Sequence, residues 1–392
     1  MNRLTIVTVL LALFSLPIAG ETSSPWVWGP LLGAVGEDSI AICWETSRSV
    51  SIDLHYSLAQ IYDVTKTWQE TLTFDKHEGH GEVWLCDLVP GEVYRYQLVA
   101  FEGDAVYPSR IGTFRTSSED LRSFSFVVYG ETRSYPDRHK LVATTIARDE
   151  PDASFAVHVG GIVESPTPER MANFLWAIDK LGRSHPYLPV VDDRLATEDL
   201  YYEAFALPPG GGRADEEWWS FDYGSVHLIG LDSSLAAGED RERSDEQLAW
   251  LRQDLAQAEG KLVVVFMSSP LYSSLYTTGR DEALRSMFEP LFSSYGVNVV
   301  VSGGMSGYEH IYVNGIHYVA TGGGGAPPSG PVNPPPAGEV FRRAGLLHYV
   351  RVTIADYAMR FEAIPVGSLE GDTVRLAPTG NAIDAFTVTI AR

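Results

Sequence analysis

The stretch VVVSGGMSGYEH, residues 299–310, is the most informative part of this 392-residue chain. Its apolar start, Val299 to Val301, predicts a short buried strand. The glycine- and serine-rich residues that follow predict a loop, because such residues favour turns and loops over regular structure. Few side chains in this loop are able to bind a metal or a substrate. The segment therefore predicts a strand that ends in a loop with little chemistry of its own.

Four other stretches have the same form, an apolar run followed by a short loop. They are FVVYGETR at 126–133, VHVGGIVE at 157–164, LPVVDDR at 188–194 and VFMSSPLY at 265–272. In this order, the five stretches resemble the metal-binding segments of the purple acid phosphatase and calcineurin-like phosphoesterase families. In those families the loops supply Asp, Asn and His ligands to a two-metal centre. The resemblance implies an α/β domain of four layers (αββα) over residues 123–392.

The resemblance also assigns the family's ligand positions to six residues, most of which are poor ligands: Glu131, Gly161, Asp193, Ser268, Gly304 and Ser306. Glu131 stands for an aspartate, Gly161 for the aspartate that bridges the metals, and Asp193 for an asparagine. The remaining three stand for histidines. Glycine and serine side chains do not replace carboxylate or imidazole ligands. The resemblance thus implies a metallophosphoesterase fold that has lost its metal centre.

We expect no resident cofactor, because only Glu131 and Asp193 keep a carboxylate among the six positions. One hard cation such as Mg²⁺ or Ca²⁺ could bind weakly between these two side chains and keep most of its water. In the alternative interpretation, both residues are ordinary solvated carboxylates at strand ends.

Three cationic residues near these positions suggest two further hypotheses. Arg194 stands for a substrate-contacting histidine, Arg133 follows the first carboxylate position, and His310 replaces a family arginine. They could form a pocket for a small anion, since arginine binds oxyanions in two-point fashion. The opposing hypothesis, which we favour, is a salt-bridged plug in which Arg194 pairs with Glu131, Asp192 or Asp193.

Residues 25–116 show short alternating stretches separated by turns, which predict an antiparallel β-sandwich. Alternation places Ile40, Ile42 and Trp44 on one face, which should be core. The segment LVPGEVY at 88–94 resembles the tyrosine corner of fibronectin type III domains. The resemblance implies a fibronectin type III-like domain.

Two cysteines lie in this first domain, Cys43 and Cys86, and they are expected to face outward on neighbouring strands. A disulfide between them is possible if the chain is exported. Two free thiols are the equal alternative, because the sequence does not give the strand register.

Residues 123–392 alternate between strand and helix patterns after a linker at 117–122. Apolar runs at 124–129, 155–159, 262–267 and 297–301 predict strands, and 139–148 predicts a helix. A capping box of Ser244 and Gln247 predicts the start of a second helix. A third helix should follow before the strand at 297–301.

The formal net charge of -22 argues against nucleic acid or an acidic lipid surface as a partner. Residues 1–20 have the form of a signal peptide, with a basic start, a short apolar run and small residues at Ala19 and Gly20. We therefore expect an exported protein with no membrane span after cleavage.

These patterns predict an exported, purple acid phosphatase-like protein without its two-metal site, a pseudoenzyme with a binding or structural role. Its partner would be a small anion or an extracellular protein. The alternative is a phosphoesterase with an altered metal site, which hydrolyses phosphate esters. A third possibility is a scaffold that acts through residues 21–116.

Overall fold

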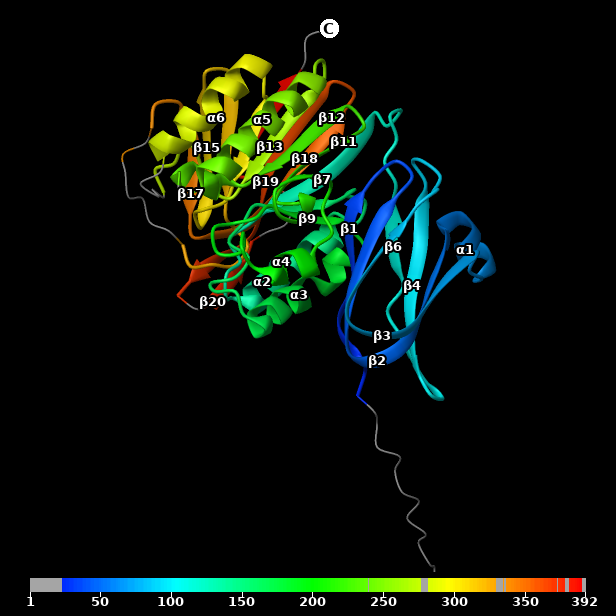
Figure 1. The fold of residues 1–392 in the computed structure, drawn as a ribbon. Coiled ribbons are helices and arrows are strands. Elements are labelled where there is room, and N and C mark those ends of the chain that lie inside the picture. The colour runs from blue at the N-terminus through cyan, green and yellow to red at the C-terminus, as the bar shows by residue number, and fades with distance from the viewer. Residues whose placement is uncertain are drawn as a thin grey trace, which may run out of the picture.

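The computed structural model describes residues 23–238, 240–275, 281–328, 334, 336–371, 373–377 and 381–389. Figure 1 shows a first domain of strands with one short helix, and a second domain of stacked sheets flanked by helices. The proposed signal peptide at 1–20 lies outside the described residues. Within them, no helix is long and apolar enough to cross a bilayer.

The first domain is built around the long strand β2. Its elements are β1 Trp26–Val35, β2 Ile40–Leu58, α1 Ala59–Thr65, β3 Glu70–Leu85, β4 Val93–Glu102, β5 Ala105–Pro108 and β6 Gly112–Arg115. One edge of β2 pairs with β3, whereas the other edge pairs first with β1 and then with β4, all antiparallel. The predicted core face is confirmed, because Ile40, Ile42 and Trp44 are all buried.

The turn before β4 contains the local hydrogen bond expected of a tyrosine corner. The backbone N–H of Val89 donates to the Tyr94 hydroxyl at 2.9 Å. The Tyr94 ring also stacks on Phe114 of β6, with ring centres 5.2 Å apart. This bond and this stack attach the turn to the strand that follows it.

Of the two alternatives for the cysteines, the structure has the two free thiols and not the disulfide. Both cysteines are free; Cys43 is buried and Cys86 is exposed. Cys43 pairs in register with Glu82, whereas Leu85, the neighbour of Cys86, pairs with Ile40. Several residues of strand therefore separate the two thiols, which is too far for a disulfide. Cys43 does point away from the core of its own domain, but Ala206 of the second domain covers it.

The second domain contains two mixed sheets. The smaller sheet has seven strands: β7 Ser123–Tyr129, β8 Ala156–His158, β9 Tyr187–Pro189, β18 Leu346–Ala355, β19 Ala358–Glu370, β20 Thr373–Leu376 and β21 Asp384–Thr389. The larger sheet has eight strands: β10 Gly210–Gly211, β11 Trp218–Tyr223, β12 Val226–Leu231, β13 Leu262–Met267, β14 Val299–Ser302, β15 Gly307–Val313, β16 Ile316–Thr321 and β17 Glu339–Ala344. The strands predicted from the apolar runs are all present.

Helices cover the outer faces of both sheets, as Figure 1 shows. They are α2 Pro136–Asp149, α3 Pro168–Gly182, α4 Asp199–Ala204, α5 Arg241–Gln257 and α6 Asp281–Tyr295, with short 3-10 helices at Arg213–Asp215 and Ser233–Ala237. Alternation along β13 separates two cores: Phe266 packs between the sheets, whereas Val265 packs under α5 and α6. The result is a helix–sheet–sheet–helix stack.

The start of α5 differs from the prediction. Its N-cap is Asp240, whose carboxylate accepts from the backbone N–H of Arg243, so the helix begins before Ser244. Gln247 has another role. Its side-chain amide bonds to both the N–H and the C=O of Asp232 at the end of β12, at 2.8 and 3.0 Å. The predicted capping box is therefore wrong. The side chain of Gln247 is buried and bonds to backbone groups at the end of β12 instead of capping α5.

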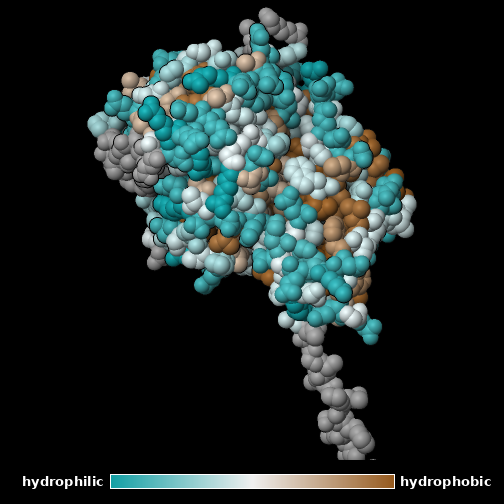
Figure 2. Space-filling view, viewed as in Figure 1, coloured by the Kyte–Doolittle hydropathy of each residue, from teal (hydrophilic) through white to brown (hydrophobic). Residues whose placement is uncertain are grey.

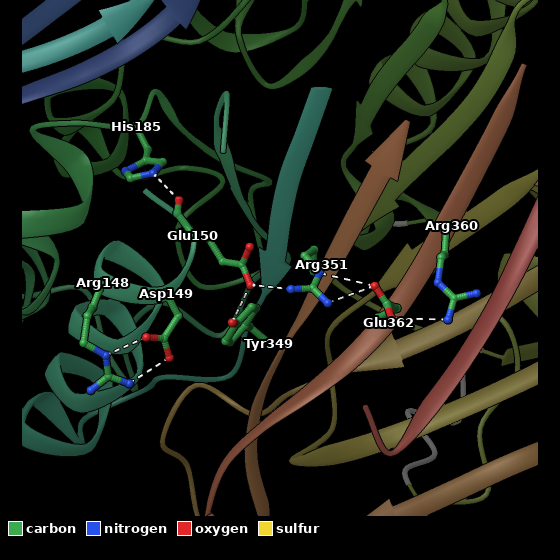
Figure 3. Close-up of polar contacts among 8 residues, drawn as sticks. All are labelled: Arg148, Asp149, Glu150, His185, Tyr349, Arg351, Arg360 and Glu362. Atoms are coloured by element: carbon green, nitrogen blue, oxygen red, sulfur yellow. Dashed lines mark hydrogen bonds and ion pairs between the residues drawn. The ribbon is translucent and has the colours of Figure 1, made fainter. Parts of the chain in front are cut away.

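A chain of polar contacts ties α2 to the smaller sheet (Figure 3). Glu150, just after α2, accepts from the Tyr349 hydroxyl at 2.7 Å and pairs with Arg351 at 3.2 Å. Arg351 in turn pairs with Glu362 of β19 at 3.0 Å. The backbone C=O of Glu150 lies 3.0 Å from the ring nitrogen Nε2 of His185. These contacts fix the helix that borders the candidate site.

The larger sheet has a buried ion pair that should make stability depend on pH. His227 lies 2.8 Å from Asp222 and 2.8 Å from Asp254 of α5. Burial alone lowers the pKa of His227, but the hydrogen bonds to the two aspartates outweigh it and raise the pKa to about 9. A folded-state pKa above the unfolded value stabilises the fold fully below about 6.5, and this contribution is lost as the pH rises towards 9.

We therefore predict that His227→Gln removes part of the pH dependence of stability between pH 6.5 and 9. The wild-type free energy of unfolding should fall by about 1–2 kcal/mol more across this window than that of the variant, allowing for the half-exposed Asp222. Urea unfolding at several pH values measures this. His55→Gln, on the first domain, is the control. If the free energies of unfolding of wild type and His227→Gln fell equally across this pH window, the raised pKa of His227 would be refuted.

Candidate functional site

The loops predicted to form the site converge on Glu131, which follows β7. Its carboxylate is buried, with only 2% of the side chain exposed, and it lies 2.6 Å from the Nε of Arg133. The backbone N–H of Gly304, after β14, donates to the same carboxylate at 3.0 Å. Burial raises the pKa of the Glu131 carboxyl, and the Arg133 guanidinium opposes this rise. Arg133 thus acts as the internal counterion of a buried carboxylate.

Glycines from two strand ends make room for this side chain, and a third glycine donates a hydrogen bond to it. A Cβ added at Gly161 would lie 2.5 Å from the Glu131 Oε1, and one added at Gly322 would lie 2.9 Å from its Cγ. The N–H donor Gly304 has a φ of +81°, which residues with a side chain rarely adopt. Glu131, one methylene longer than aspartate, therefore occupies the space that a residue at 161 would fill.

The second carboxylate near the site is Asp192, not Asp193. Asp192 is buried, and its two oxygens accept from the N–H groups of Gly161 at 2.8 Å and Arg194 at 3.0 Å. Burial raises the pKa of Asp192, and its charge also raises that of Glu131. Asp193 is exposed on the outer side of the turn. The expected pair of cation ligands, Glu131 and Asp193, is therefore not brought together.

The three positions expected for histidine ligands hold small, enclosed residues. The Ser268 hydroxyl lies 2.9 Å from the Ser233 hydroxyl, which also accepts from the N–H of Ser269 at 3.0 Å. Ser306 is buried, with 8% of its surface exposed. A Cβ at Gly304 would lie 2.7 Å from the Pro270 Cδ. The loops have closed around small residues, and an imidazole at Gly304 would require the backbone to move.

The structure does not place Arg194 and His310 beside Arg133 as a three-residue anion pocket. The Arg194 guanidinium lies 3.7 Å from the exposed carboxylate of Asp193, at the surface. His310 is buried between the sheets, 2.9 Å from Asp384 and 2.9 Å from His317. Of the three partners expected for Arg194 in the plug, it contacts Asp193, but this pair lies at the surface. The buried carboxylate of Glu131 is paired with Arg133 instead.

The residues present do not fit a two-metal centre. Among the described residues, no group of three or more His, Cys, Asp or Glu side chains is arranged to hold a metal ion. One oxygen of Glu131 is taken by Arg133 and the other by the N–H of Gly304. A dication near Glu131 would also face the fixed charge of Arg133. The donor set and the local charge both disfavour a metal here.

Comparison with known proteins supports the resemblance. No protein-family model matches the chain. An acid phosphatase of Aspergillus ficuum is 28% identical over 158 residues, which cover 30% of this chain and 26% of the relative. The chain thus matches only about a quarter of that relative's length.

Solved structures match over a longer range. A purple acid phosphatase from yellow lupin, PPD1, superposes with a TM-score of 0.71 at 15% identity, covering 92% of this chain and 74% of that one. The chain is purple acid phosphatase-like. GAP50, described as the anchor in the inner membrane complex of Plasmodium, superposes with a TM-score of 0.52 at 15% identity, covering 67% of this chain and 91% of that one.

The sequence analysis named Asp192 only as a possible partner of Arg194 and assigned the ligand position to Asp193, although Asp192 is the buried carboxylate of this purple acid phosphatase-like chain. The doublet Asp192-Asp193 gave no reason to choose between its members, because burial depends on how the turn after β9 is oriented. Arg133 was named as a cation near the site, but its contact with Glu131 was not. The only signal in the sequence was that the two residues are separated by one position. In the structure both have positive φ angles, 57° and 46°. Such a turn brings their side chains together.

We predict that Arg133→Met destabilises the protein by about 3 kcal/mol at pH 7, because it leaves Glu131 buried without its counterion. The double variant Glu131→Gln/Arg133→Met should recover most of this loss, since a neutral amide can still accept from Gly304. Urea unfolding measures both. Arg194→Met is the matched control and should change stability by less than about 1 kcal/mol, because its partner is exposed. Equal losses of stability in Arg133→Met and Arg194→Met would contradict the role of Arg133 as the counterion of Glu131.

We also predict that Gly161→Asp alone is destabilising by about 3 kcal/mol, through the collision with Glu131 and the φ of +69°. Gly238→Asp isolates the backbone cost, because Gly238 has a similar φ of +74° and no atom near its added Cβ. Adding Glu131→Ala to Gly161→Asp should restore about 1–2 kcal/mol. Thermal and urea unfolding measure this coupling. If Glu131→Ala restored no stability to Gly161→Asp, Glu131 would not fill the space beside position 161.

Proposed function

We propose that this purple acid phosphatase-like chain is a pseudoenzyme with a binding or structural role. The observation that supports this most strongly is the contact between Glu131 and Arg133, because it puts a fixed cation and a neutralised carboxylate where metal ligands would be needed. The glycines at 161 and 304 add no donor side chain. Water activation by a metal needs anionic or imidazole ligands and an open coordination position.

The fold itself is compatible with a role other than catalysis. GAP50, whose published description calls it an anchor, shares the fold. For the present chain we propose export after removal of residues 1–20. We also propose that the first domain is a fibronectin type III-like module that positions the second, an assignment supported by the bond between Val89 and Tyr94.

A scaffold role of the first domain is a second candidate, and its surface favours it. Seven of the fourteen large apolar side chains that are exposed among the described residues lie in this domain, with Val64 the most exposed at 84%. Figure 2 shows hydrophobic residues gathered on the side of the molecule formed by the first domain. A protein partner retained by residues 21–116 alone would support this candidate.

The competing enzymatic proposal is a phosphoesterase with a reduced metal site. It draws support from the acid phosphatase relative and from the two buried carboxylates, Glu131 and Asp192. In the pseudoenzyme proposal, the protein holds at most one weakly bound divalent cation. The two proposals therefore differ in metal content as well as in turnover.

We predict that purified protein, incubated with Mn²⁺, Zn²⁺ and Fe³⁺ and then dialysed, retains far less than one transition metal per chain and does not hydrolyse p-nitrophenyl phosphate. Metal analysis by mass spectrometry and an absorbance assay measure this. Glu131→Gln serves as the control for contaminating phosphatase. Stoichiometric metal together with turnover that Glu131→Gln abolishes would establish the enzyme instead.

A further inference from the structure

A separate cavity lies beside the plug, between the first turn of α2 and helix α3. The cavity between α2 and α3 has a volume of about 350 Å³ and is lined in part by Arg133, Ser134, His139, Arg170, Asn173 and Phe174. Of these residues, only Arg133 also belongs to the plug around Glu131. The cavity is therefore a different site from the one that the metal-binding loops would form.

Arg170 gives this cavity a positive charge that the protein does not neutralise. Its guanidinium donates to the Ser134 hydroxyl at 3.0 Å, which holds the side chain in place. No carboxylate among the described residues forms an ion pair with it, although the chain as a whole carries a net charge of -22. Arg133, the second guanidinium, is held from the other side by Glu131 and, at 3.5 Å, by the exposed Glu164. The two arginines are thus positioned before any ligand arrives.

The start of α2 adds to this field. Helix α2 is 14 residues long, and its N-cap residue, Tyr135, provides no capping hydrogen bond from its side chain. The partial positive charge of a helix N-terminus favours an anion close by. Ser134 and Pro136, which flank this N-cap, both line the cavity. The helix end therefore supplements the two guanidinium groups.

We propose that this cavity binds a small organic molecule through an oxyanion group, namely a phosphate, sulfate or carboxylate. Arg170 and Arg133 would contact the oxyanion, since a planar guanidinium matches two of its oxygens. The inference rests on the binding role proposed above and adds the chemical class of the ligand. The cavity is at the lower end of the size range of small-molecule sites, so it has room for an organic group beside the oxyanion.

One lining residue opposes this ligand. Glu169 lies at the cavity, is exposed, and would repel an anion. Removing the Glu169 charge should therefore strengthen anion binding while leaving both arginines in place. If Arg170 had only a structural role, this change would not affect binding.

The experiment is calorimetric titration of the full chain with inorganic phosphate, sulfate, acetate and phenyl phosphate, in EDTA and at constant ionic strength. We expect Arg170→Gln to weaken binding about tenfold or more, since it removes a charged hydrogen-bond donor. Glu169→Gln should tighten it. Arg194→Gln is the matched control and should bind like wild type. Comparing phenyl phosphate with inorganic phosphate shows whether the organic group contributes.

Three results would overturn the proposal: no binding of any probe to wild type, binding unaffected by Arg170→Gln, or binding lost in Arg194→Gln. Thermal unfolding of each variant verifies that it is folded. Because EDTA excludes metal, failure of this test leaves the pseudoenzyme proposal standing. Conversely, metal-dependent turnover would refute the pseudoenzyme without deciding whether this cavity binds anions.

Discussion

Burying the carboxylate of Glu131 is the constraint on which the rest of the site depends. A charge removed from water needs a counterion and hydrogen bonds, and Glu131 obtains both from Arg133 and the N–H of Gly304. The surrounding backbone must then leave room for a side chain one methylene longer than aspartate. Gly161 and Gly322 leave that room, because a Cβ at either position would collide with Glu131. The absence of a side chain at Gly161, one of the expected ligand positions, thus has a physical cause in the burial of Glu131.

The ion pair between Glu131 and Arg133 also changes the chemistry that this fold can perform. A two-metal centre concentrates positive charge that can polarise a phosphate ester and activate water. A guanidinium supplies charge and directional hydrogen bonds, but it cannot lower the pKa of a bound water as a metal does. Arg133 therefore suits recognition of an anion better than its hydrolysis. This distinction supports a binding role in a fold shared with phosphatases.

Much of the fold could be predicted because alternation and apolar runs report burial directly. The strands at 124–129, 262–267 and 297–301 are examples. The errors concern contacts that depend on register or on the second domain. Cys43 points outward from its own sandwich, yet Ala206 covers it. Asp192 and Asp193 are alike in sequence, and only the orientation of the turn buries one of them.

Arg133 links the plug to the neighbouring cavity, and this link limits how strongly an anion can bind. Its charge is already shared with Glu131, so an anion that approaches it gains less than it would from an unpaired arginine. Arg170 has no such competitor among the described carboxylates and should provide most of the attraction. The arrangement therefore assigns different tasks to the two residues: Arg133 balances the buried charge of Glu131, and Arg170 is the cation that remains available to a ligand.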